Sequence, residues 1–456
     1  MLVIISDLHI TDESTAKNVR PEAFDVILGP RIITAAEKNS ATEINITLLG
    51  DIFDLVRTDY WLKIHRGDRP WNGQLDPKTG MNINAAANEA HFGQILDKIF
   101  ATDTSRRFID LLKNLPAAAG RPVKVTYIIG NHDRCLNNYP SLVNKIKNQL
   151  PGMEVEFANV LHAPAYGVLA RHGHEWDVQT HGWEFYNKVL ADEDPKLHRF
   201  HKDSYKIMAI GEVITAELMA GLIYRFAENL PGESLENDKK LLENLKNVNN
   251  LRPMTNVFEW LVWLMQDAAV LPGSYKSILY SSLKEALSGV LDSTLAGEWD
   301  KMANDLIFWG DITDRLEKFR MILSVSNYDH LSFLVNAFEK MINEEEDYRK
   351  YSRGAMQEWE MEHGLDMTDI QYIVYGHTHR AERTYFSGSP QGKVKMYINT
   401  GTFLPLIQRT DDKKGFAMDH RLSTVFFYNR DEDFNGRSDE GPTLELWNGV
   451  KRKYYQ

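Results

Sequence analysis

The sequence has almost no cysteine and no excess of positive charge. Its 456 residues include one cysteine, Cys135, so an intramolecular disulfide is impossible, which suits a reducing compartment. The formal net charge is −12, whereas a surface for duplex nucleic acid needs clustered lysine and arginine. Duplex nucleic acid is therefore an unlikely partner on composition, although a local basic groove is compatible with it.

Long hydrophobic runs and a leader-like beginning are missing as well. The segment MLVIISDLH at residues 1–9 has no basic stretch and no small-residue cleavage site, and it predicts a first strand. The longest apolar helical run, at 257–271, contains Glu259, Gln266 and Asp267 and is too short to cross a bilayer. We therefore expect a cytoplasmic protein without a transmembrane segment.

The sequence does contain five apolar strand-like runs that each end in side chains able to bind a metal. Open α/β sheets carry their sites beyond the carboxyl ends of the strands, and residues two apart in a strand point the same way. We therefore expect the five run ends to meet. Their polar residues are Asp7 and His9; Asp51 and Asp54; Asn131 and His132; His172 and His174; and His377 and His379.

Each motif alone is weak evidence, because a single D-x-H or G-N-H is usually a turn. In chain order they read D-x-H, G-D, G-N-H-D, H-G-H and G-H-T-H. This order resembles the calcineurin-like metallophosphoesterases, over residues 1–177 and 366–456. The resemblance implies an α/β fold, a four-layer αββα sandwich, and two-metal-dependent hydrolysis of phosphoric esters.

The resemblance also implies a ligand set. Asp7, His9 and His379 would bind one metal, and Asp51 would bridge to the other, with a hydroxide between the two as the nucleophile. The ligands of the second metal would be Asn131, His172 and His377. Carboxylate, imidazole and amide ligands without thiolate suit two divalent ions of Mn²⁺, Fe²⁺ or Zn²⁺, and Mn²⁺ is favoured.

A second set of residues is expected to act on the substrate. The resemblance implies that His132, supported by Asp54, protonates the leaving oxygen; the alternative is that Asp54 only caps a helix. His174, Arg57 and Arg380 are candidate substrate contacts. His65 and Arg66 are further candidates for binding an anionic group. The alternative is that their loop is ordinary solvated surface, held in place by Trp61 and Trp71. The N-T-G turn at Asn399 is interpreted as structural.

One repeated motif is rejected as a site. Residues 305–314 spell G-D-x-x-D a second time, at Gly310 to Asp314, but they follow the G-N-H and H-G-H motifs. The resemblance has no place for the motif there, and the sequence that follows suits the start of a helix. We therefore assign the bridging role to Asp51 and not to Asp311.

Residues 178–365 form an expected helical insertion that caps the site. Apolar residues recur every three or four positions from Ile207 to Leu222, which predicts one helix, and further helices are predicted at 256–270, 275–290 and 328–345. Another helical stretch is predicted at about 83–114. The length of the chain also favours two domains or one domain with a large insertion.

The expected substrate is a phosphorylated small molecule or a nucleotide. The place of the cap resembles UDP-2,3-diacylglucosamine pyrophosphohydrolases, but those usually spell the third motif G-N-R-D where this chain has His132. This departure counts against such a substrate, so a pyrophosphohydrolase of a nucleotide-linked lipid remains an alternative only. A nuclease is another alternative. A metal-binding interaction module is the non-enzymatic alternative.

Overall fold

The computed structural model is a mixed α/β protein with two mixed β-sheets. It describes residues 1–183, 199–230, 235–252, 256–266, 273–303, 348–361, 364–386, 394–433 and 442–454, with a few single residues between 313 and 323. The α/β class predicted from the sequence is confirmed over this part of the chain. Asp311 and the predicted helix 328–345 lie outside the described residues.

The first sheet has seven strands in the order β10-β11-β1-β2-β3-β4, with β12 beside β11. Strands β1 to β4 are parallel to one another, and β11 runs antiparallel to β1. The bounds are Leu2–Ile5 (β1), Ile44–Leu49 (β2), Val123–Ile128 (β3), Glu154–Ala158 (β4), Pro405–Arg409 (β10), Phe416–Tyr428 (β11) and Thr443–Tyr454 (β12).

The second sheet has five strands in the order β5-β6-β7-β9-β8. Strands β6 and β7 are parallel neighbours, although the whole predicted insertion separates them in the sequence. The bounds are Leu161–Ala163 (β5), Val168–Ala170 (β6), Tyr372–Tyr375 (β7), Glu382–Phe386 (β8) and Lys395–Asn399 (β9).

Alternate strand residues pack into different hydrophobic clusters, as the two-residue period of a strand requires. Leu2 and Ile4 share a cluster with Val374 and other residues of the second sheet. Their neighbours on β1 instead join the largest cluster, which contains residues of helices α1 (Gly29–Lys38) and α4 (Asp103–Ala119). The opposite face of the second sheet packs with residues of α15 (Arg349–Glu360).

The helical stretch predicted at 83–114 consists of two helices, α3 (Ala85–Phe100) and α4. The break occurs at Thr102, whose side chain accepts a hydrogen bond from the Ser105 backbone N–H at 3.3 Å and so caps α4. The short helices α2 (Tyr60–Lys63) and α5 (Pro140–Lys147) complete this half of the chain.

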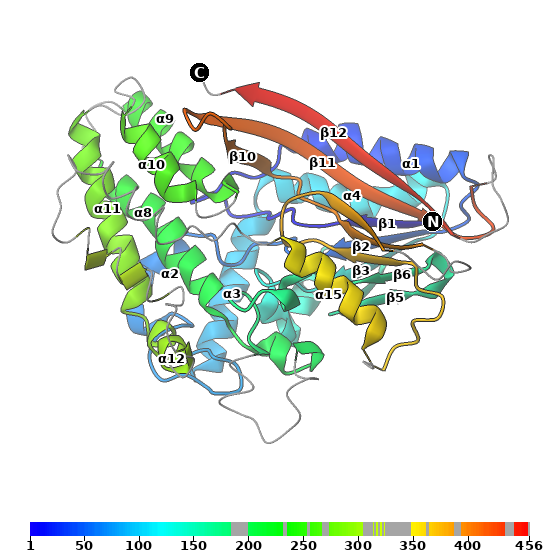
Figure 1. The fold of residues 1–456 in the computed structure, drawn as a ribbon, viewed down its shortest axis with the longest axis horizontal. Coiled ribbons are helices and arrows are strands. Elements are labelled where there is room, and N and C mark those ends of the chain that lie inside the picture. The colour runs from blue at the N-terminus through cyan, green and yellow to red at the C-terminus, as the bar shows by residue number, and fades with distance from the viewer. Residues whose placement is uncertain are drawn as a thin grey trace.

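The described part of the predicted insertion is largely helical, and its helices α8 to α12 lie to one side of the two sheets (Figure 1). The predicted helices near 256–270 and 275–290 are present within the described residues, with revised ends. The bounds are Ile210–Val213 (α7), Gly221–Glu228 (α8), Leu235–Leu245 (α9), Val257–Gln266 (α10), Gly273–Leu291 (α11) and Thr294–Ala303 (α12).

The helix predicted from Ile207 to Leu222 begins later and is not regular, because a π-helical segment, Ile214–Ala220, joins α7 to α8. Its residue Glu217 is fully buried and accepts hydrogen bonds from Arg69 Nη1 at 2.5 Å and Trp71 Nε1 at 2.8 Å. These bonds pin the loop after Asp54 to the insertion.

Helix α15 falls within the range 178–365 but packs against the second sheet. Its Glu358 accepts a hydrogen bond from Arg171 Nε at 2.9 Å, next to strand β6, and it also bonds to Tyr375 of β7. The division into a core and an insertion stays a prediction. Helix α15 lies near the predicted end of the insertion at residue 365, and its packing associates it with the second sheet.

One helical stretch among the described residues, Ser204–Glu228, is long and apolar enough to cross a membrane. Within the protein, however, 78% of its most apolar window is buried. Its apolar side chains therefore already have protein partners, as in the core helix of a soluble protein.

The largest hydrophobic cluster contains residues of the first sheet and residues of the insertion, including Leu287 of α11. We therefore expect Leu287→Ala to destabilise the whole protein by about 2–5 kcal/mol, through the cavity it leaves. Leu287→Met, which conserves volume, is the control and should cost less than about 1.5 kcal/mol. Calorimetry should show one unfolding transition that moves; a separate transition that moves alone would contradict a shared core.

Candidate metal centre

The seven predicted metal ligands follow the carboxyl ends of five strands. Asp7 and His9 follow β1, Asp51 follows β2, and Asn131 follows β3 of the first sheet. His172 follows β6 of the second sheet, and His377 and His379 follow β7. Since β1, β2 and β3 are parallel to one another, as are β6 and β7, their carboxyl ends meet at one edge of each sheet.

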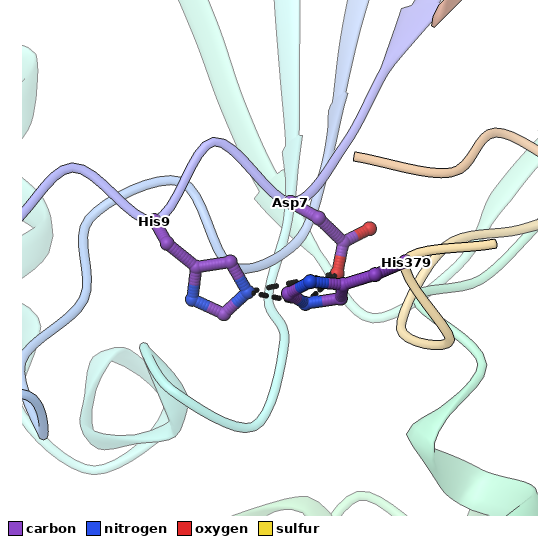
Figure 2. Close-up of side chains that lie close together, drawn as sticks. All are labelled: Asp7, His9 and His379. Atoms are coloured by element: carbon purple, nitrogen blue, oxygen red, sulfur yellow. Dashed lines mark hydrogen bonds and ion pairs between the residues drawn. The ribbon is translucent and has the colours of Figure 1, made fainter. Parts of the chain in front are cut away.

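Three of these side chains form a first group in which Asp7, His9 and His379 point toward one another (Figure 2). The Nε2 atoms of His9 and His379 are 2.8 Å apart. Asp7 Oδ1 lies 3.8 Å from Nε2 of His9 and 3.5 Å from Nε2 of His379. One carboxylate oxygen and two imidazole nitrogens therefore converge, which is a donor set that divalent transition metals accept.

A second group consists of Asp51, His172 and His377. The Nδ1–H of His172 donates to the backbone carbonyl of Leu49 at 2.9 Å, so its Nε2 is the nitrogen left to bind a metal. Among the described residues, that Nε2 has the Asp51 carboxylate nearby but no hydrogen bond of good geometry, and Oδ1 of the predicted ligand Asn131 is buried without a partner. Buried polar atoms normally have partners, and a metal ion would supply one to both.

Asp51 lies between the two groups. Its Oδ2 is 3.6 Å from Nε2 of His9 and 3.2 Å from Nε2 of His172. Its Oδ1 accepts a hydrogen bond from the His132 backbone N–H at 2.8 Å, which holds the carboxylate in place. Asp51 therefore lies within 4 Å of a histidine from each group.

The backbone is unusual at the same residues. Five predicted ligands have φ in the left-handed region, which side chains other than glycine rarely adopt: Asp7 (51°), His9 (42°), Asp51 (54°), His377 (70°) and His379 (59°). Each such residue costs on the order of 1–3 kcal/mol, and residues of this kind concentrate at functional sites. Backbone strain is therefore present at five of the residues that the sequence predicted to be metal ligands.

Glycines in the motifs leave room for the ligands. A Cβ on Gly50 would overlap the ring of His172, and a Cβ on Gly376 would overlap the carboxylate of Asp7. Gly50 also has a φ of +81°. The G-D and G-H spellings therefore have a steric reason, because the backbone must pass directly behind another ligand.

Electrostatics put His9 and Asp51 in the form that binds a metal, whereas His172 and Asp7 would have to release protons to a bound ion. Burial and the nearby guanidinium of Arg57 lower the pKa of His9 to about 3, so this imidazole is neutral. Burial opposes the ionised forms of Asp51 and His172, but their mutual attraction prevails: the pKa of Asp51 falls well below its usual value, and that of His172 rises to about 10. Burial raises the pKa of Asp7 to about 7, so a metal would displace protons here.

His132 and Asp54 lie beside the first group. His132 Nδ1 is 3.0 Å from Asp54 Oδ2, the same oxygen that accepts a hydrogen bond from His9 Nδ1 at 2.8 Å. Oδ1 of Asp54 accepts from the backbone N–H groups of Val56 and Arg57. Asp54 therefore orients a predicted ligand as well as His132, and it also caps the chain that follows it.

The other candidate substrate residues divide into two sets. Arg57 is buried beside Asp54, with its Nε 3.3 Å from Oδ2. His174 is buried next to His181 and Tyr205, and its ring centroid lies 5.3 Å from that of the predicted ligand His172. Arg380 is exposed and lies over the ring of Tyr348. His65 and Arg66 are exposed, while Trp61 and Trp71 are buried, as in the surface interpretation of that loop.

Sequence reasoning missed two residues at the centre. Arg252, from the insertion, has its Nη2 2.8 Å from Nδ1 of His379. Asp177 Oδ2 lies 3.5 Å from Nε2 of His377. Asp177 follows the H-G-H motif by only three residues, and this closeness could have identified it. Nothing in the sequence around Arg252 marks that residue.

The N-T-G turn supports the centre from below, as predicted. Asn399 Nδ2 donates to the Gly376 carbonyl at 2.6 Å, and Thr402 Oγ1 donates to the Asp7 carbonyl at 2.7 Å. The turn thus connects the backbone of both ligand-bearing segments, which gives it a structural role.

Asp51→Asn should lower metal content and reduce any metal-dependent turnover by orders of magnitude, because one carboxylate serves both groups. Asp311→Asn, in the repeated motif, is the matched control and should keep the metal of the wild type. Elemental analysis of the purified variants measures this directly. Equal metal loss in the two variants would contradict the assignment of Asp51.

Comparison with known proteins adds no family name to this geometry. No protein-family model matches the chain, and no curated protein sequence matches it. The buried aspartate and histidine groups therefore stand on their own as a centre compatible with divalent metal binding.

Proposed function

We propose that the protein is a metallophosphoesterase of the calcineurin-like type, a two-metal-dependent hydrolase of phosphoric esters. The observation that carries this proposal is the convergence of six predicted ligands, from the ends of β1, β2, β6 and β7, and of His132, from the end of β3, into overlapping groups. The motifs were singled out by their order in the sequence, and the chain brings their side chains together although hundreds of residues separate some of them.

The proposed architecture is a four-layer αββα sandwich with residues 1–177 and 366–456 as the catalytic core. Its support is the packing: one hydrophobic cluster draws on both sheets, a second joins the first sheet to α1 and α4, and a third joins the second sheet to α15. Residues 178–365 are proposed as a cap, since Arg252 reaches the metal centre.

Two divalent ions held here, with Mn²⁺ favoured, would activate a water and withdraw charge from the phosphoryl oxygens. Asp7, His9 and His379 would hold the first ion, and Asn131, His172 and His377 would hold the second. Asp51 would be a ligand to both. The carbonyl of Leu49 fixes the tautomer of His172, and Asp54 does the same for His9.

His132 is proposed to carry the proton that the leaving oxygen receives. Its Nδ1 faces Asp54, and its Nε2 is therefore the atom that can hold and transfer a proton. The carboxylate of Asp54 stays ionised, because His132 and Arg57 outweigh the effect of burial and hold the pKa of Asp54 well below its usual value. It can thus stabilise a charged imidazole next to the substrate.

The substrate is proposed to be a phosphorylated small molecule or nucleotide, acted on in the cytoplasm. The direct test is hydrolysis of 4-nitrophenyl phosphate by the protein before chelation, after chelation and after reloading with Mn²⁺. Activity should be lost and regained. A protein that binds Mn²⁺ but hydrolyses no aryl phosphate ester would instead be a metal-binding module.

His132→Ala should retain its metal but lose activity in a way that depends on the leaving group. General acid catalysis is typically worth about 10²–10⁴-fold and matters most when the departing alkoxide is basic. A plot of log kcat against leaving-group pKa should therefore be steeper for His132→Ala than for the wild type. His162→Ala, on β5 and away from the centre, is the control.

Parallel lines for wild type and His132→Ala would mean that His132 only binds phosphate charge. Asp54→Asn should show the same steepening more weakly, together with a loss of metal, because Asp54 also orients His9. Metal content measured on the same samples separates these two effects.

A further inference from the structure

Two buried arginines lie beside the first metal group, and they come from distant parts of the chain. Arg57 is 5% exposed and follows strand β2, whereas Arg252 is 8% exposed and belongs to the insertion. A short chain of contacts links them: Arg57 Nε lies 3.3 Å from the Asp54 oxygen that bonds to His9, and His9 Nε2 lies 2.8 Å from His379, the ring that Arg252 contacts. They therefore share one neighbourhood.

The backbone of Arg57 is fixed by hydrogen bonding, whereas its guanidinium is not. Its backbone N–H donates to Asp54 Oδ1 at 2.9 Å, and its Nε lies 3.3 Å from Asp54 Oδ2. Its Nε and Nη1 are buried, yet neither has a hydrogen-bond acceptor of good geometry among the described residues. Buried donors of a charged group that lack acceptors are costly, so an oxygen-rich ligand at this place would be stabilised.

Arg252 is fixed in position by the backbone around it. Its N–H donates to the Ile407 carbonyl on β10 at 2.9 Å, next to a bridge between Leu251 and Ile407. Its Nη1 donates to the carbonyls of Leu251 at 2.7 Å and Asn249 at 3.2 Å. These bonds leave Nη2 pointing at His379, 2.8 Å from Nδ1. The insertion thus delivers a positive charge to the metal centre.

Charge at the centre indicates which phosphate ester fits. Asp7, Asp51 and Asp54 are the carboxylates around the first group, and Arg57 and Arg252 offset two of them. Two divalent ions would then leave a clear positive surplus. A phosphomonoester carries up to two negative charges and three non-bridging oxygens, whereas a diester carries one charge and two such oxygens. The monoester can engage the ions and still offer an oxygen to a guanidinium.

We propose that Arg57 and Arg252 form a clamp for a doubly charged phosphoryl group, and that this clamp makes the protein selective for phosphomonoesters over phosphodiesters. The proposal rests on the proposed function. A guanidinium suits this task because it is planar, always charged and able to donate two parallel hydrogen bonds to phosphate oxygens. The cap therefore contributes to specificity through one residue, Arg252.

The test uses the full-length protein loaded with Mn²⁺ and compares Arg252→Ala, Arg252→Lys and Arg57→Lys with the wild type. Calorimetric titration with inorganic phosphate should show affinity about 10- to 100-fold weaker in Arg252→Ala, as expected for a lost charged hydrogen bond. The kcat/KM for 4-nitrophenyl phosphate should fall by a similar factor. The kcat/KM for bis(4-nitrophenyl) phosphate should change less than about threefold.

Arg107→Ala is the matched control, because it removes an exposed guanidinium of α4 that pairs with Asp25. Arg252→Lys keeps the charge and should retain part of the phosphate affinity, and added guanidinium should restore part of the monoester activity of Arg252→Ala. Metal content and melting temperature, measured on each variant, identify any that is misfolded. Arg57→Lys then tests the clamp independently of the cap.

Equal losses on the two esters, or an unchanged phosphate affinity in both Arg252→Ala and Arg57→Lys, would overturn the clamp. Failure of the proposed function gives a different result, since the wild type would then hydrolyse neither ester. The phosphate titration does not depend on turnover, so it decides the clamp in that case also.

Discussion

The carboxylate of Asp51 is the contact on which the arrangement of the metal centre depends. It stands between His9 of the first sheet and His172 of the second, at 3.6 Å and 3.2 Å, and the backbone of His132 holds its other oxygen. Moving either sheet relative to the other would pull apart the ligands within each group, because each group draws on both sheets. The packing between the two sheets therefore also sets the distances between Asp51 and the histidines on either side of it.

The strained backbone of the ligands needs a rigid support, which the structure provides on several sides. Asp133, one residue after His132, accepts hydrogen bonds from the Gly130 backbone N–H at 2.5 Å and from Tyr127 Oη at 2.6 Å. Behind the second group, Arg171 donates to Glu358 and Tyr205. Such buried networks stabilise one arrangement of the loops strongly when every member is satisfied.

The insertion contacts this support at more than one point. Arg134, adjacent to the G-N-H-D motif, has its Nε 2.6 Å from Glu212 Oε1 in α7, and Glu217 binds the loop after Asp54 through Arg69. Together with Arg252 at His379, these contacts connect helices of the cap to three separate loops of the centre. If these residues form the proposed cap, it would act on substrate selection through such contacts and without contributing a metal ligand.

The local sequence was sufficient to predict the five strands that carry the motifs, the polar residues at their ends and the α/β class. These features depend on side-chain period and on turn residues, which act over a few positions along the chain. Glycine is sterically required at positions 50 and 376, which explains why the G-D and G-H motifs can be recognised in the sequence. The same local reasoning predicted a regular helix over Ile207–Leu222 and missed the π-helical segment, because a buried partner for Glu217 lies far away in sequence.

Only the tertiary structure decided which residues outside the motifs reach the centre. Arg252 arrives there because its backbone pairs with Ile407 of β10, and Asp54 serves both His9 and His132 because two loops close around it. Arg380, adjacent to a predicted ligand, is turned to the surface instead. Pairings between distant segments follow from the packing of the whole chain, so sequence spacing near a motif carries no information about them.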